Sequence, residues 1–105
     1  MTRGGVFRLR APGGRRGHEQ DGTRYGVVIQ ADELLGLSTV VVAPTSASAQ
    51  PATFRPVITI GGTPTRILTE QMRAVDARRL GRCAGRLEVS ELQALDEALK
   101  LVLAL

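Results

Sequence analysis

Residues 6–10 form a short segment in which apolar and polar residues alternate, a pattern typical of a β-strand with one buried face. Residues 39–43 differ, because a nearly continuous β-branched run is typical of a strand buried on both faces. We expect Pro44 to end that strand, and Pro56 to lie near an edge or at a strand start. The pattern predicts strands at residues 6–10, 25–30, 39–43, 54–60, 65–75 and 81–87, a turn at 61–62, and short helical turns at 32–35 and 76–80.

The C-terminal segment changes to helical spacing. One apolar stripe, which we expect to pack against the sheet, is formed by Leu92, Leu95, Leu99 and Val102. Ser90 followed by Gln93 is a capping-box pattern, so the helix is predicted to begin there. Asp96 and Lys100 are expected to pair across one turn on the outside of the helix.

Residues 11–23 are rich in glycine and charge and cannot bury a face, so they predict a long exposed loop. A loop of this length inside a small domain is usually functional or disordered. With the predicted strands and the terminal helix, the pattern indicates a mainly β fold with helices (all-β or α+β). We expect a small, partly open β-barrel in a single domain that covers residues 1–105.

Composition narrows the classes of function. The chain has 105 residues and a formal net charge of +4, which is compatible with an RNA partner without requiring one. Cys83 is the only cysteine, which excludes an intrachain disulfide and favours a reducing compartment, so a cytoplasmic protein is expected. With His18 as the only histidine, no standard zinc site can form, and no apolar run is long enough to span a bilayer.

Several short motifs follow each other along the chain. Residues 17–24 (GHEQDGTR) combine two glycines, a glutamate and an arginine ahead of the apolar strand. Residues 41–46 (VVAPTS) end a strand in Pro and two hydroxyl residues, residues 69–75 read TEQMRAV, and residues 3–7 read RGGVF. In this order and spacing they resemble the signatures of the MazF/PemK (Kid-like) toxins of type II toxin–antitoxin systems, and residues 80 onward are similar to that family's closing pattern.

The resemblance implies an SH3-like barrel of the CcdB/Kid/MazF type that forms a homodimer. It implies sequence-specific cleavage of single-stranded RNA, with mRNA, rRNA and tRNA as candidate substrates, without a metal or other cofactor. Attack by the RNA's own 2′-hydroxyl would leave a 2′,3′-cyclic phosphate and a 5′-hydroxyl. It also implies a MazE-like antitoxin whose extended acidic segment binds in the RNA groove, and no membrane partner.

The same resemblance assigns candidate catalytic residues. Arg24 is expected to hold its guanidinium against the scissile phosphate, where it would neutralise developing charge. Glu19, five residues earlier, is the expected general base or the carboxylate that orients Arg24. Ser46 falls at the position of the family's catalytic threonine, and Thr45 takes that position after a shift of one residue. Either hydroxyl could hydrogen-bond the phosphate.

Other residues are expected to contact RNA. Tyr25 stands where the family has proline, and it could stack on a base or be a packing residue. Glu70 is a candidate second carboxylate and Arg73 a backbone contact, with an ion pair or a solvated face as the alternative for both. His18 is at most an accessory acid or base. The expected RNA contacts are Arg15, Arg16, His18, Gln20, Tyr25, Glu70, Gln71 and Arg73.

Alternative functions stay open at this point. Gly5 and Phe7 replace the family's common Glu and Trp, so a weakly active toxin is one alternative. A toxin of the same fold that inhibits DNA gyrase is a second. A non-catalytic SH3-like binding module is a third, and it would tolerate substitution of Arg24 and Ser46. Covalent chemistry by Cys83 is poorly supported, because only one histidine exists to partner it.

Overall fold

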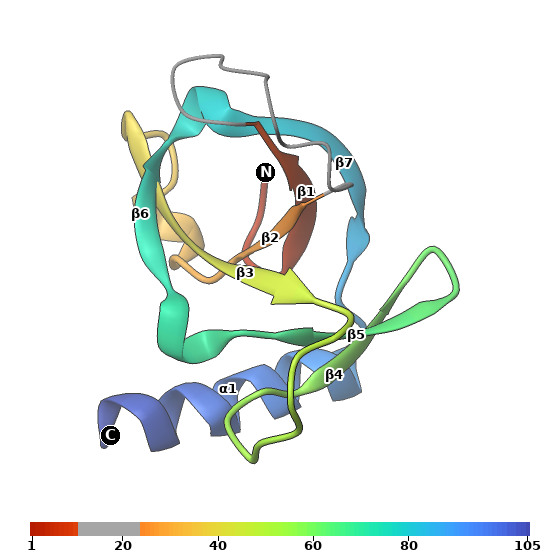
Figure 1. Cartoon of the computed structure of the whole chain (residues 1–105). Helices are drawn as coiled ribbons and strands as arrows, with labels where there is room; N and C mark the ends of the chain where they lie inside the picture. Colours follow the sequence, from red (N-terminus) through yellow and green to blue (C-terminus); the bar gives the residue numbers. More distant parts are fainter. Residues whose placement is uncertain (11–23) are drawn as a thin grey trace.

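The structure is a computed structural model that describes residues 1–10 and 24–105, so the loop predicted at 11–23 lies outside the described residues. Figure 1 shows the arrangement of the elements. The strands are β1 (Gly5–Leu9), β2 (Tyr25–Val28), β3 (Thr39–Ser46), β4 (Val57–Ile60), β5 (Thr63–Ile67), β6 (Arg73–Asp76) and β7 (Leu80–Arg86). The 3₁₀ turns are η3 (Asp32–Leu34), η4 (Thr69–Gln71) and η5 (Ala77–Arg79), and the helix is α1 (Val89–Leu103).

The strands form an antiparallel sheet that curls into a ring (Figure 1). β1 lies between β2 and β7, and β2 lies beside β3. β6 pairs with the other edge of β3 and continues through η5 into β7, so the sheet returns to β1. The β4–β5 hairpin joins the end of β3, and α1 lies outside the ring next to it (Figure 1). The prediction of a mainly β, partly open barrel with a C-terminal helix is confirmed.

Side-chain alternation gives the curled sheet two apolar faces. The face inside the ring buries valines of three strands, namely Val28, Val40, Val42 and Val75. The outer face packs against α1 and the β4–β5 hairpin, and the core between them buries Val6, Val27, Ala43, Ile58, Ile67, Leu95 and Leu99. Val42 and Ala43 are both fully buried but belong to different cores, so the prediction of a strand buried on both faces is confirmed.

Pro44 does not end β3, contrary to the prediction, because the strand continues to Ser46. The carbonyl oxygen of Pro44 accepts the N–H of Leu68 at 2.8 Å. The N–H and C=O of a strand residue point to the same side, so the missing N–H of Pro44 also faces η4 rather than β2. On that side β3 changes partner, since its pairing with β6 ends at Val42 and its pairing with β5 starts at Thr45. No ladder bond is lost there, so proline is tolerated.

The single strand predicted at residues 65–75 is also wrong, because β5 and β6 are separate and η4 lies between them. The two strands pair with different stretches of β3, so the chain must turn a corner. Thr69 fixes this corner, since its buried hydroxyl donates to the carbonyl oxygen of Phe54. Phe54 itself lies ahead of β4, which begins only after Pro56, so the predicted strand at 54–60 is shorter at its start.

The start of α1 differs from the predicted cap at Ser90. The helix begins at Val89, and the N–H of Glu88 donates to Oε1 of Glu91 at 2.9 Å in a capping box two residues earlier than expected. The other oxygen of Glu91 accepts the N–H of Thr59 at 3.0 Å, so this cap also ties the helix to β4. Glu91 is the third residue of a helix capped at Glu88, so the bond from Thr59 that holds its carboxylate favours the start at Val89.

The predicted pair between Asp96 and Lys100 does not form. Asp96 accepts a hydrogen bond from the guanidinium of Arg3 at 2.8 Å, and Lys100 lies 3.4 Å from Glu97. Arg3 also donates to the carbonyl oxygen of Ile29 at 3.0 Å, so it joins the N-terminus, the end of β2 and α1. The apolar stripe of the helix is oriented as predicted, with Leu95 and Leu99 buried against the sheet. Among the described residues, no helix is long and apolar enough to cross a membrane.

Asp76 makes folding dependent on pH at the corner between β6 and β7. Its carboxylate accepts the backbone N–H of Arg78 at 2.8 Å and the guanidinium of the same residue at 2.9 Å. These bonds from Arg78 lower the pKa of Asp76 from 3.8 to about 2. Because the folded pKa is depressed, the stabilisation is present above about pH 4 and is lost as the pH falls towards about 2.

We therefore expect the difference in unfolding free energy between the wild type and Asp76→Asn to shrink across that window. Urea unfolding of both proteins at a series of pH values measures it. Asparagine keeps the size and the capping oxygen of aspartate, so the comparison isolates the charge. A difference that stays constant from about pH 5 to about pH 2 would show that the Asp76 carboxylate is not stabilised in this way.

Candidate active site

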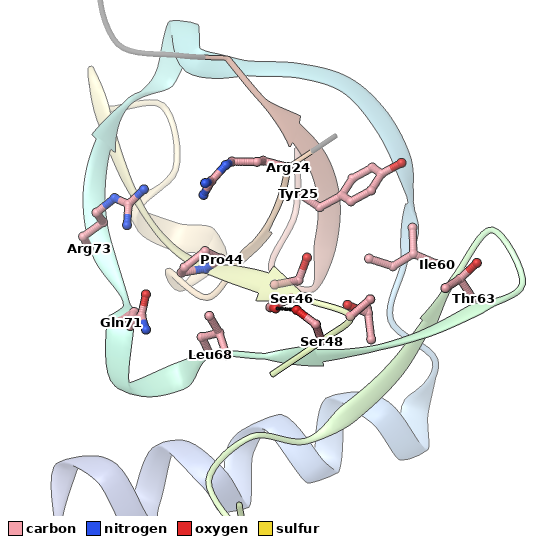
Figure 2. Close-up of a pocket in the computed structure, with 13 residues that line it drawn as sticks. Arg24, Tyr25, Pro44, Ser46, Ser48, Ile60, Thr63, Leu68, Gln71 and Arg73 are labelled. Carbon is pink, nitrogen blue, oxygen red and sulfur yellow. Dashed lines mark hydrogen bonds between the residues drawn. The ribbon is translucent and has the colours of Figure 1, made fainter. Parts of the chain in front are cut away.

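A pocket of about 570 Å³ opens at the end of the ring where β2 begins and β3 ends. Six of the predicted site residues line it, namely Arg24, Tyr25, Thr45, Ser46, Gln71 and Arg73. The other lining residues are Pro44, Ala47, Ser48, Ile60, Thr63, Thr65 and Leu68. Figure 2 shows these side chains around the mouth of the ring, with Arg24 and Tyr25 opposite Leu68 and Gln71.

The fold explains why two arginines meet at this pocket. Arg24 lies four residues before Val28 and Arg73 two residues before Val75, so strand alternation directs both side chains to the inner face of the ring. The carbonyl oxygen of Arg24 accepts the N–H of Leu9 at 2.9 Å, which holds its backbone against β1. In Figure 2 the Arg24 side chain points across the opening towards Arg73.

The charge at this end of the ring is positive. The ion pairs among the described residues involve other basic side chains, and neither Arg24 nor Arg73 takes part in them. Burial and the nearby charge of Arg73 lower the pKa of Arg79. The two guanidiniums are exposed and face one opening, and no carboxylate is among the described residues that line it. This arrangement suits an anion such as phosphate.

Hydroxyl groups lie on the side of the pocket formed by the end of β3. Thr45 and Ser46 pair with Ile67 and Arg66 of β5, so their backbone is fixed by the sheet. Oγ of Ser46 lies 3.4 Å from Oγ of Ser48 in the loop that follows. A hydroxyl on a fixed strand end can donate a hydrogen bond to an oxygen that the two arginines attract.

Glu70 is not brought into the pocket, although it was a predicted RNA contact. Its carboxylate accepts hydrogen bonds from the guanidinium of Arg55 at 2.6 and 3.1 Å. The hydrogen bond from Arg55 is the main cause of a lowered pKa for Glu70. The predicted residues Arg15, Arg16, His18, Glu19 and Gln20 lie outside the described residues.

The sequence did not indicate that the β4–β5 hairpin contributes to the site. Ile60, Thr63 and Thr65 enter the pocket because β5 pairs with the end of β3. Thr63 and Thr65 are two positions apart, so their hydroxyls share one face of β5. This spacing was the one signal in the sequence that could have indicated a polar wall here. Among the described residues, no three His, Cys, Asp or Glu side chains are grouped so that they could hold a metal ion.

The comparison with known proteins agrees with this architecture. The chain resembles the MazE–MazF complex of Deinococcus radiodurans, with a TM-score of 0.79 and 18% identity over 100% of this chain and 96% of that chain. It also resembles an endoribonuclease in complex with its cognate antitoxin from a mycobacterial species. That TM-score is 0.77, with 15% identity over 100% of this chain and 96% of that chain. At these identities the solved structures show the fold alone.

Sequence comparison identifies the family. A candidate toxin of Mycobacterium tuberculosis is 49% identical over 75 residues, which span 71% of this chain and 70% of that relative. The family model of the PemK-like, MazF-like toxins of type II toxin–antitoxin systems matches residues 2–103. The match covers β1 to α1 and therefore both sides of the pocket. The chain thus belongs to the PemK-like, MazF-like toxin family of type II toxin–antitoxin systems.

Proposed function

We propose that this toxin is an endoribonuclease that cleaves single-stranded RNA without a metal ion. The observation that carries the proposal is the convergence of Arg24 and Arg73 on one pocket that also holds the hydroxyls of Ser46 and Thr45. A pocket with two cations and several donors suits a phosphodiester, whose charge increases as the reaction proceeds. Membership of the toxin family supports the same conclusion.

In the proposed reaction the 2′-oxygen of the RNA attacks the adjacent phosphorus and loses its proton to a base. The new bond between the 2′-oxygen and phosphorus closes a 2′,3′-cyclic phosphate, and the bond to the 5′-oxygen breaks. The leaving oxygen takes up a proton and ends as a 5′-hydroxyl. No atom of a metal or of a water molecule enters this balance.

Each pocket residue has a proposed part in this reaction. The guanidinium of Arg24 would neutralise charge on the non-bridging oxygens, and Arg73 would hold a neighbouring backbone phosphate. The hydroxyl of Ser46, or that of Thr45, would donate to the same oxygens. Gln71 would hydrogen-bond the RNA at the opposite wall. Glu70 is left out of the proposed site, because its carboxylate pairs with Arg55.

The remaining roles fall on residues outside the described part of the chain. We propose Glu19 as the general base or as the carboxylate that orients Arg24, with His18 as an accessory acid or base. Arg15, Arg16 and Gln20 would extend the contacts to the RNA backbone.

The proposed partners follow from the same pocket. An antitoxin with an extended acidic segment could place its carboxylates against Arg24 and Arg73 and exclude RNA. The two solved relatives with bound antitoxin are consistent with such a partner. We also propose a homodimer as the working form. Because its substrate would be mRNA, or other cellular RNA, we expect it to act in the cytoplasm.

The test is incubation of the purified, antitoxin-free protein with a long single-stranded RNA in EDTA, followed by mapping of the product ends. We expect cuts at a recurring short motif, with 5′-hydroxyl and 2′,3′-cyclic phosphate ends. An RNA with 2′-deoxyribose at the cut position should stay intact, because the nucleophile is missing. Intact RNA in the presence of folded protein would overturn the proposal. Gyrase supercoiling and nucleic-acid binding assays would then follow.

A further inference from the structure

Tyr25 gives the pocket a second, apolar end. It is the neighbour of Arg24, and adjacent residues on a strand project to opposite faces, so the two side chains diverge. Figure 2 shows the Tyr25 ring pointing away from Arg24, on the side of the opening where Ile60 of β4 lies. Arg24 therefore faces the charged side of the pocket and Tyr25 the side formed by the β4–β5 hairpin.

The burial of Tyr25 leaves part of its ring accessible. The ring is half-buried and packs against the outer core, yet the residue also lines the pocket. Part of the Tyr25 side chain is therefore available to a ligand in the pocket. Ile60 is likewise half-buried and packs against the same core, so the two side chains form a supported apolar wall.

The two ends of the pocket match the two ends of a nucleotide. A nucleotide carries its charge on the phosphate and presents an uncharged, flat base at the other end of the sugar. We infer that Tyr25 is a stacking platform for a nucleobase next to the scissile phosphate, with Ile60 against the edge of that base. Stacking on an aromatic ring accepts any base, so this contact contributes affinity and position more than sequence preference.

This inference rests on the proposed function, because its ligand is the RNA that is cleaved. It assigns a position to that RNA: the phosphate lies at Arg24 and a base lies at Tyr25. Two consecutive residues, Arg24 just before β2 and Tyr25 at its start, would then fix the orientation of the RNA strand across the pocket. Since Arg24 and Tyr25 share one stretch of backbone, the sheet holds the two contacts at a constant separation.

The chain offers a direct optical test. Tyr25 is the only tyrosine and there is no tryptophan, so tyrosine fluorescence of the intact protein reports on this residue alone. The probe is a short 2′-O-methyl RNA oligonucleotide, which cannot be cleaved because its nucleophile is blocked. We expect saturable quenching by this probe and little quenching by an abasic ribose-phosphate chain of the same length. Equal quenching by both, or none by either, would overturn the stacking assignment.

Variants provide a second measurement that does not depend on fluorescence. Binding of a labelled 2′-O-methyl oligonucleotide should be about 10-fold or more weaker for Tyr25→Ala and nearly unchanged for Tyr25→Phe. Phe54→Leu is the matched control, because Phe54 lies outside the pocket and should keep the wild-type affinity. Thermal unfolding of each variant shows whether the fold is retained. Equal affinity of Tyr25→Ala and wild type would contradict the inference.

The outcomes separate this inference from the proposed function. Cleavage of RNA in EDTA, with no base-dependent quenching, would keep the nuclease and remove Tyr25 as a stacking residue. Base-dependent quenching without cleavage would keep the stacking contact and remove the nuclease. The second outcome would describe a toxin that binds single-stranded RNA in this pocket without cutting it.

Discussion

Replacing Arg24 with alanine is expected to slow RNA cleavage by about 10²–10³-fold while leaving the fold intact. The loss is large because the guanidinium would act on charge that develops only in the transition state. The fold should survive because the Arg24 side chain is exposed and contributes to neither core. Its backbone carbonyl, which accepts the N–H of Leu9, is the same in alanine. The unfolding free energy should change by no more than about 0.5 kcal/mol.

Single-turnover cleavage of an RNA that carries one mapped site measures this effect without interference from product release. Arg82→Ala is the matched control, since Arg82 is an exposed arginine of β7 that does not line the pocket. It removes the same charge and should keep the rate. Arg24→Lys should fall between the two, because a point charge replaces a planar fork. If Arg24→Ala and Arg82→Ala lost rate equally, a general charge effect would explain the result and Arg24 would leave the site.

Parallel purification of these variants also identifies the source of the cleavage. A contaminating nuclease could produce the same ends in EDTA, but its activity would not depend on residue 24. A rate that follows Arg24, Arg24→Lys and Arg24→Ala in descending order therefore assigns the activity to this pocket.

Local patterns in the sequence predicted strands of the sheet and the buried face of the helix. Alternation identified β1, a nearly continuous β-branched run identified β3, and the spacing of Leu92, Leu95 and Leu99 identified the buried face of α1. The short segments around Arg24, Ser46 and Arg73 could be recognised because each is contiguous. The structure brings them together because β2, β3 and β6 are neighbours in the sheet.

The errors arose where a tertiary contact decided between local alternatives. Asp96 could pair with Lys100 in its own helix, but it pairs with Arg3, which is 93 positions away in the chain. For Glu70 the sequence left an ion pair open as the alternative to an RNA contact, and the structure shows such a pair, with Arg55. No periodicity reports a partner at such a separation. The contribution of Ile60 to the pocket was missed for the same reason, since it depends on how the hairpin packs.

The largest loss of stability is expected from Leu95→Ala, at about 3–5 kcal/mol. Leu95 is fully buried at the junction of α1 with the outer face of the sheet, where it packs in one cluster with Val27 and Ile67. Truncation removes buried methyl groups and leaves a cavity, because strands on one side and the helix on the other limit collapse. Small domains are stable by about 5–15 kcal/mol, so this loss is a large share of the total. The variant should therefore be half unfolded at a urea concentration well below the wild-type midpoint.

Leu101→Ala makes this expectation specific to the core. Both leucines lie in α1, so the two substitutions change helix propensity equally, but Leu101 is 58% exposed whereas Leu95 is 0% exposed. Urea unfolding should therefore give an unfolding free energy for Leu101→Ala within about 0.5 kcal/mol of the wild type. Similar losses in both variants would mean that α1 is stabilised through its outer surface, as it would be if a second protein chain covered Leu101. Dilution of the protein distinguishes that case, because only a stability that depends on association falls with concentration.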